Sequence, residues 1–292
     1  MSIPVFYDER QSVVHAHGIS PSSGKPRLIV EQWRARSLDI AIAAVAPATR
    51  RDLYRAHVPD YVDGVLDLRI ANGFGDTRAD LAASLPWTSG SLLTAARHVL
   101  AQGGHACSPT SGFHHACHGR GGGFCTFNGL MVTALALQAE GRAGLIGIID
   151  IDQHYGNGTD DIITSQGLDS IRHYTFGADH TCDSWNGGER AERWLAELPG
   201  LVRGFRDCDL VLYQAGGDPH VDDPLGGALT SAQMRSRDRI VFSGLQTVPL
   251  VWNLAGGYQE PVQKVLDLHH ATMEECLRVD RLRGPGISPR SG

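Results

Sequence analysis

The feature that most constrains this sequence is an apolar run that leads without a break into three polar residues. Residues Leu145–Thr159 read LIGIIDIDQHYGNGT, and the aliphatic half of this stretch ends at Asp150. The run is too short for a surface helix and too apolar for a loop, so it predicts a buried strand of a parallel sheet over Leu145–Asp152. Alternate side chains of a strand share a face, so we expect Asp150, Asp152 and His154 to point the same way.

Such a grouping carries an electrostatic cost. Two carboxylates close together raise each other's pKa, and burial adds a desolvation penalty for each charge. A bound divalent cation removes both penalties. The alternative is a strand end whose charged groups meet solvent and pair with Lys or Arg. The D-x-D-x-H pattern by itself does not choose between a metal site and a solvated strand end.

Apolar and amphipathic segments alternate along the rest of the chain. Strands are expected at Ile3–Tyr7, Ile171–Phe176, Leu210–Gln214 and Val248–Asn253, and helices at Ser89–Gln102, Phe127–Gly141, Ala191–Phe205, Ser231–Gln246 and Pro261–Val279. This alternation predicts one α/β domain over residues 1–292, with a doubly wound, mostly parallel sheet flanked by helices and a tail at 283–292.

The first third of the chain is harder to interpret. Helices are expected over Arg27–Arg36, Ser37–Val45 and Arg50–Val58. Two glycines and a proline make Asn72–Trp87 irregular, so a long surface loop is predicted there.

Composition limits the classes of partner. The formal net charge of −6 gives no reason to expect a nucleic acid or an anionic membrane. The N-terminal MSIPVFYDER lacks the pattern of a signal peptide, and no apolar stretch reaches transmembrane length. Six cysteines without C-x-x-C spacing are typical of reduced thiols. We therefore expect a cytoplasmic enzyme.

Three further polar clusters lie at the ends of predicted elements. They are GFHHA at 112–116, followed by GGGFC at 121–125; AGGDPHVDDPLG at 215–226; and AGGY at 255–258. Asp218 comes first after its strand and two glycines, so it is the natural extra metal ligand. Asp222 and Asp223 lie deeper in that turn, where capping or solvation is favoured.

Each cluster also has an ordinary interpretation. His114 and His115 would pass for surface histidines if they stood alone, and Tyr258 for a tyrosine packed at a strand end. The pair His269-His270 in the last predicted helix serves as a control, because His269 falls on an apolar helix face with no carboxylate or glycine turn nearby. We predict a structural role for that pair.

Taken together, the clusters follow a rule of open α/β sheets, in which ligands bind at the carboxyl ends of the strands. Asp152, His154 and Asp218 would supply three protein ligands to one metal and leave room for water and substrate. Two carboxylates and one imidazole suit Zn²⁺, and Fe²⁺, Co²⁺ or Mn²⁺ could substitute.

These motifs, in this order from Phe6 to Tyr258, resemble the histone deacetylase and acetylpolyamine amidohydrolase family of the arginase/deacetylase fold. The resemblance implies a Zn²⁺-dependent deacetylase that acts on an acylated amine or acyl-lysine. It implies the following site: Asp152, His154 and Asp218 as metal ligands; His115 as general base and acid; His114, oriented by Asp150, as an electrostatic group; Tyr258 as the oxyanion donor; and Gly123 with Phe124 as a wall of the substrate tunnel. Asn157 stands where many relatives carry a second orienting Asp, so His115 is expected to be less basic than it would be with an Asp partner. It also implies a structural K⁺ near Asp150, and an oligomer is possible.

The sequence departs from the family pattern in places that bear on the substrate. The early H-P-E-R-P-x-R-type segment is replaced by Ser20–Leu28, and Gly217 stands where many histone deacetylases have Phe. The aromatic wall after the strand Ile171–Phe176 is missing, and Trp185 is a possible replacement. Two other functions stay open: a catalytically silent scaffold, which would be expected to lose Tyr258 or a histidine, and a two-metal ureohydrolase, which needs more carboxylates.

Overall fold

The structure, a computed structural model, describes residues 2–14, 20–180 and 188–282. Within these ranges seven strands form one sheet in which every pair of neighbours is parallel, in the order β2-β1-β3-β7-β6-β4-β5. The strands are β1 (Ile3–Phe6), β2 (Ile40–Ala43), β3 (His105–Ser108), β4 (Ile146–Asp150), β5 (Ile171–Thr175), β6 (Leu210–Gln214) and β7 (Leu250–Asn253). This is the predicted α/β fold with a parallel sheet.

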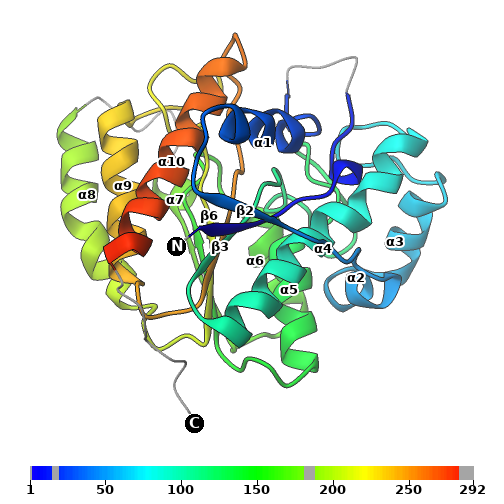
Figure 1. Cartoon of the computed structure of the whole chain (residues 1–292). Coiled ribbons are helices and arrows are strands. Elements are labelled where there is room, and N and C mark those ends of the chain that lie inside the picture. Colours follow the sequence, from blue (N-terminus) through cyan, green and yellow to red (C-terminus); the bar gives the residue numbers. More distant parts are fainter. Residues whose placement is uncertain (1, 15–19, 181–187, 283–292) are drawn as a thin grey trace.

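Helices cover both faces of the sheet (Figure 1). One face is packed by α1 (Lys25–Ala35), α8 (Gly188–Arg203), α9 (Ser231–Gly244) and α10 (Gln263–Leu282). The other is packed by α2 (Arg50–Ala56), α3 (Pro59–Leu66), α4 (Ala79–Gln102), α5 (Gly129–Ala139) and α6 (Asn157–Gln166). Two short helices, η1 (Glu9–Gln11) and α7 (Phe176–Asp179), lie in connections.

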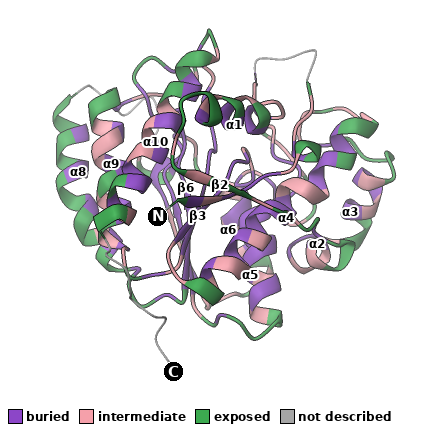
Figure 2. Ribbon diagram, in the orientation of Figure 1, coloured by how far each residue is buried: buried purple, intermediate pink, exposed green. Residues whose placement is uncertain are grey.

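The apolar core is divided into two clusters by the sheet. Along β4, Ile149 packs into the cluster that contains α8, α9 and α10, whereas Ile148 packs into the cluster that contains α4 and α5. Because both faces are covered, β4 is buried along its whole length, as its aliphatic run predicts. In Figure 2 most strands of the sheet, at the centre of the molecule, are drawn as buried, and the outer sides of the helices are exposed. The five cysteines within the described ranges are buried, and Cys182 lies outside those ranges.

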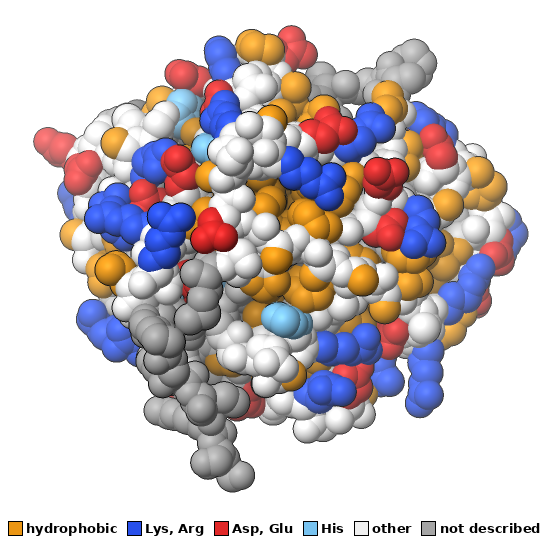
Figure 3. All heavy atoms as spheres, in the orientation of Figure 1, with side chains coloured by type: hydrophobic (Ala, Val, Ile, Leu, Met, Phe, Trp, Pro, Cys, Tyr) orange, Lys and Arg blue, Asp and Glu red, His pale blue; other side chains and the backbone are white. Residues whose placement is uncertain are grey.

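Two expectations for the N-terminal third are wrong. Ser37–Val45 is not a helix, because Ile40–Ala43 forms β2 and pairs with β1 in the register Ile3↔Ile40. The alternation of Ile and Ala suits an edge strand, and apolar side chains gather where β2 crosses the face in Figure 3. The predicted loop Asn72–Trp87 ends early, because α4 begins at Ala79 and continues through Pro86.

Two features of the sheet also differ from expectation. The strand β3 was not predicted, since its four residues HACS lack an aliphatic run. The strand β4 ends at Asp150, so Asp152 and His154 lie in the loop beyond it rather than on one strand face. With β3 in place, the four polar clusters follow β3, β7, β6 and β4, which are neighbours in the sheet. Their loops therefore meet at one edge.

None of the helices within the described ranges is long and apolar enough to span a membrane.

Candidate metal centre and active site

The three predicted ligands converge in the loops after β4 and β6. Nδ1 of His154 lies 3.2 Å from Oδ1 of Asp152 and 2.9 Å from Oδ2 of Asp218. Within the described ranges, these residues form the group of His, Cys, Asp and Glu side chains that could hold a metal, with ligand atoms within 4.8 Å of one another. Asp152 and Asp218 are buried, and His154 is partly exposed, so one side of the centre faces solvent.

The electrostatics of this group favour a positive charge at its centre. Hydrogen bonds to the carboxylates of Asp152 and Asp218 raise the pKa of His154 to about 11, although burial opposes the shift. Burial and the charge of Asp152 raise the pKa of Asp218. A proton on His154 would neutralise only one of the two carboxylate charges. A divalent cation among the three ligand atoms would let both carboxylates stay ionised, so the donor set fits a metal.

The backbone fixes the two carboxylates. Oδ2 of Asp152 accepts from the N–H of Gly256 at 2.9 Å, and its Oδ1 accepts from the N–H of His154 at 3.0 Å. Oδ1 of Asp218 accepts from the N–H of Gln153 at 3.2 Å. Each carboxylate is thus oriented before any ligand binds.

Asp150 turns away from the metal group and holds His114 instead. Its Oδ2 lies 2.8 Å from Nδ1 of His114, and its Oδ1 accepts from Nε2 of Gln214 at 3.0 Å. Burial opposes a charge on His114, but the carboxylates of Asp150 and Asp152 outweigh it and raise the pKa of His114 to about 9. Without a bound metal, His114 is therefore expected to be positively charged at neutral pH.

His115 has the opposite electrostatics. Its Nδ1 lies 2.6 Å from Oδ1 of Asn157, which can only accept, so Nδ1 carries the proton and Nε2 keeps its lone pair. Burial and the charge of His114 lower the pKa of His115 to about 4. The two adjacent imidazoles, with ring centroids 4.0 Å apart, are thus held in different protonation states.

The loop that carries His114 and His115 (Gly112–Ala116, the histidine loop) is held by the start of α6. The N–H groups of Gly158 and Thr159 donate to the carbonyl oxygen of His114 at 2.8 and 3.1 Å. A side chain at Gly158 would come within 2.5 Å of the backbone of Ala116, so glycine is required for this approach. The sequence GNGT therefore leads straight into α6 and packs it against the histidine loop.

Tyr258 is carried by a tightly bonded turn after β7. Its N–H donates to Oδ2 of Asp223 at 2.8 Å, and Oδ1 of the same buried carboxylate accepts from the N–H of Leu225 at 3.0 Å, so Asp223 bonds backbone and is not in the metal group. Ala255 has φ 53° and Gly257 has φ 130°, both positive. The Tyr258 ring lies 6.4 Å from the His154 ring and 6.0 Å from the Phe124 ring, measured between centroids. Burial and the carboxylates of Asp218 and Asp152 raise the pKa of Tyr258, so its hydroxyl keeps its proton and can donate.

Gly123 and Phe124 lie beside these groups. A side chain at Gly123 would come within 2.5 Å of the His115 ring, and Phe124 has φ 61°. The Phe124 ring also lies 5.6 Å from the ring of Phe74, between centroids, and its N–H donates to the carbonyl oxygen of Gly73. Phe124 therefore stands between Tyr258 and an aromatic neighbour that the sequence did not single out.

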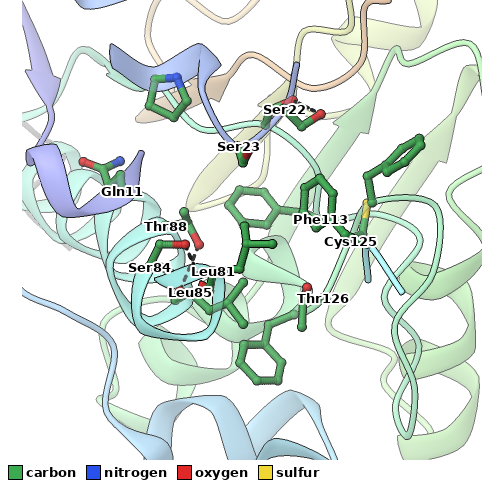
Figure 4. Close-up of a pocket in the computed structure, with 15 residues that line it drawn as sticks. Gln11, Ser22, Ser23, Leu81, Ser84, Leu85, Thr88, Phe113, Cys125 and Thr126 are labelled. Carbon is green, nitrogen blue, oxygen red and sulfur yellow. Dashed lines mark hydrogen bonds between the residues drawn. The ribbon is translucent and has the colours of Figure 1, made fainter. Parts of the chain in front are cut away.

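A cavity is lined by Phe113, which precedes the two histidines, and by the segment Phe124–Phe127 (Figure 4). Phe113 and Cys125 belong to its wall, as do Ser22 and Ser23 from the segment before α1. Its lining also includes Ser84 and Thr88 of α4. None of the three candidate ligands lines the cavity, but Phe124 does, so the cavity adjoins the site on the Phe124 side.

The structure adds residues that the sequence did not indicate. Gln214, at the end of β6, donates to Asp150. A polar residue at the end of an apolar strand is a sequence feature that could have indicated its role. Lys25 donates to the carbonyl oxygens of Ala255 and Gly256 from 230 residues away, a contact without a local signal. His269 lies against Gly217 and is not in the metal group. Trp185 lies outside the described residues.

Comparisons with known proteins can now be added to this geometry. Residues 22–170, just over half of the chain, match the histone deacetylase domain family. This chain belongs to the histone deacetylase family. The acetylpolyamine amidohydrolase 2 of Pseudomonas aeruginosa is 32% identical over 261 residues, which cover 78% of this chain and 72% of that protein. The histone deacetylase 2 of Arabidopsis thaliana is 29% identical over 181 residues, 56% of this chain and 46% of that protein.

Solved structures agree on the fold of this deacetylase family member. The HDA15 HD domain superposes with a TM-score of 0.78 at 20% identity, covering 99% of this chain and 92% of that one. The acetylpolyamine aminohydrolase from Burkholderia pseudomallei superposes with a TM-score of 0.72 at 17% identity, covering 95% and 99%. At these identities the likeness concerns the fold, which is the arginase/deacetylase α/β fold predicted from the motifs.

Proposed function

We propose that this chain is a Zn²⁺-dependent amidohydrolase that removes an acetyl or another small acyl group from a lysine side chain, a polyamine or a related amine. One observation carries the proposal. Asp152, His154 and Asp218 converge on one point, and a neutral His115 and a protonated Tyr258 stand beside it. Membership of a deacetylase family supports the reaction class.

Zn²⁺ would be held by Asp152, His154 and Asp218, where it would polarise the amide carbonyl and acidify a water molecule. Fe²⁺ or Co²⁺ would suit the same donors. A structural K⁺ near Asp150 stays part of the proposal, with backbone carbonyl oxygens as its ligands.

Each remaining residue has a task that follows from its protonation state. The free Nε2 of His115 takes the proton of the attacking water and later returns it to the leaving amine. His114, whose Nδ1 is held by Asp150, acts mainly as an electrostatic group beside His115. Tyr258 donates to the oxyanion of the tetrahedral intermediate. Gly123 and Phe124 line the passage for the acylated chain.

Two other functions are less well supported. A silent scaffold does not need the separate protonation states of His114 and His115, nor a phenol beside the metal centre. A two-metal ureohydrolase needs a second set of carboxylates, and within the described ranges the metal-binding group has three members. The proposal includes no nucleic acid or membrane partner and a cytoplasmic location, while an oligomer stays possible.

The test compares the purified protein with its Tyr258→Phe variant on acetyl-lysine peptides, acetylpolyamines and small acyl amides. The variant keeps the ring and removes the donor, so its kcat should fall about 10²–10³-fold. Its zinc content and Tm should stay near those of the wild type. A zinc-loaded wild-type protein that hydrolyses none of these substrates would refute the proposal.

A further inference from the structure

Lys25 is an unusual residue for this chain. It is one of only two lysines in the sequence, beside many arginines, and the other lysine, Lys264, is exposed on α10. Lys25 is fully buried at the first position of α1. A buried ammonium group loses its hydration, and burial lowers its pKa to about 8. Such a residue needs specific partners.

Its partners belong to the turn that carries Tyr258. Nζ of Lys25 donates to the carbonyl oxygen of Ala255 and, at 3.2 Å, to that of Gly256. The carboxylates of Asp218 and Asp152 stabilise the ammonium charge from farther away. Lys25 thus binds the backbone of the turn through hydrogen bonds, and its positive charge is attracted by the carboxylates of the metal centre.

This turn needs an external support. Ala255 has φ 53°, a left-handed conformation that a residue with a side chain adopts at a cost. The hydroxyl of Ser111 also donates to the Ala255 carbonyl, at 2.5 Å. Two donors from distant parts of the chain therefore hold one strained carbonyl group.

The same turn connects two parts of the site. The N–H of Gly256 donates to Oδ2 of Asp152, and its carbonyl oxygen accepts from Lys25 and from the N–H of Gly217. Gly257 and Tyr258 follow directly. A rotation of the Ala255–Gly256 peptide would therefore move the Tyr258 phenol and remove a hydrogen bond from a candidate metal ligand.

We propose that Lys25 is a positioning residue that holds the Ala255–Gly257 turn and thereby places the Tyr258 hydroxyl for the hydrolysis proposed above. The inference rests on that proposed function for its kinetic part only. It assigns a role to Ser20–Leu28, the segment in which the sequence departs from the family pattern. The ordinary alternative is that Lys25 only anchors the start of α1.

The experiment compares Lys25→Met, Lys25→Arg and the control Arg27→Met, which removes a charge from an exposed residue in the same helical turn. Three quantities are measured: kcat and KM on the best acyl amide, zinc content, and hydrogen exchange of the backbone amides of Gly256 and Tyr258. Both amides donate to carboxylates, so both report on the turn without any substrate.

For Lys25→Met we expect kcat to fall about 10–100-fold, the order of effect that a misplaced catalytic group produces. KM and zinc content should change little, and the two amides should exchange at least about tenfold faster. Lys25→Arg should recover part of the lost kcat, and Arg27→Met should match the wild type.

A double-mutant cycle separates positioning from anchoring. If Lys25 acts through Tyr258, Lys25→Met should lower kcat far less in a Tyr258→Phe background. Full additivity, or unchanged kcat and exchange in Lys25→Met, would overturn the inference. If Lys25→Met does not fold, Lys25→Arg and Ser111→Ala decide: both should speed exchange of Gly256, and no change in either overturns it. A wild type without activity refutes the hydrolase proposal, while the exchange measurement still tests Lys25.

Discussion

The contrast between His114 and His115 leads to a prediction for Asn157→Asp. The two imidazoles are adjacent, and His114 is buried whereas His115 is half-buried. The ring bonded to a carboxylate has a pKa of about 9, and the ring bonded to an amide has a pKa of about 4. Asp at position 157 would put a negative charge next to Nδ1 of His115, where Oδ1 of Asn157 now lies at 2.6 Å. The pKa of His115 should therefore rise.

The size of the shift follows from Coulomb's law. A unit charge about 4 Å from the ring, at an effective dielectric constant of about 20, contributes about 4 kcal/mol, or roughly three pH units. Desolvation of the new carboxylate and partial solvent access reduce this, so we expect a rise of about one to three units. His115 must be neutral to accept a proton, so activity is lost as the pH falls through its pKa. The acid limb of the pH dependence of kcat/KM should therefore move to higher pH.

The assay is the pH dependence of kcat/KM for a zinc-loaded enzyme. The acid limb of Asn157→Asp should lie about one to three units above that of the wild type. Ser165→Asp adds the same charge to an exposed position of α6 and is the matched control, for which no shift is expected. An acid limb that stays in place or moves to lower pH, with zinc content unchanged, would refute the role assigned to His115.

The other predictions concern the metal and the buried charges. Asp218→Ala should lose its zinc on dialysis while the wild type keeps it, because two ligands remain of three; equal metal content would remove Asp218 from the site. Arg237→Met should lower the free energy of unfolding by about 3–5 kcal/mol in urea titrations, because it leaves the fully buried carboxylate of Asp238 without its ion pair. Arg239→Met should cost under about 1 kcal/mol, because Arg239 is half-exposed and its buried partner Glu275 keeps an ion pair with Arg235; equal losses would contradict the argument.

The sequence alone determined the parts of this protein that depend on short-range pattern. The aliphatic run before Asp150 specifies a strand buried on both faces, and β4 is that strand. The glycine turns after β6 and β7 deliver Asp218 and Tyr258 to one edge of the sheet, because parallel strands end at the same edge. The metal group could therefore be predicted without knowing how the strands are ordered.

Tertiary structure decided what depends on partners far apart in the chain. Ile40–Ala43, within the predicted helix Ser37–Val45, became a strand because β1 offered a parallel neighbour. The helix α4 began before Pro86 because Leu81 and Leu85 pack into the core. In both places, burial against distant elements outweighed local propensity.

The division of labour between the two aspartates was also a tertiary outcome. Asp150 and Asp152 are equivalent in the D-x-D pattern, yet Asp150 bonds His114 and Gln214 whereas Asp152 joins the metal group. The support of Tyr258 by Lys25 is the extreme case, since their segments lie 230 residues apart and meet only because α1 packs beside the turn after β7. A sequence pattern records which groups are present, and the folded chain decides which of them are close enough to share a proton or a charge.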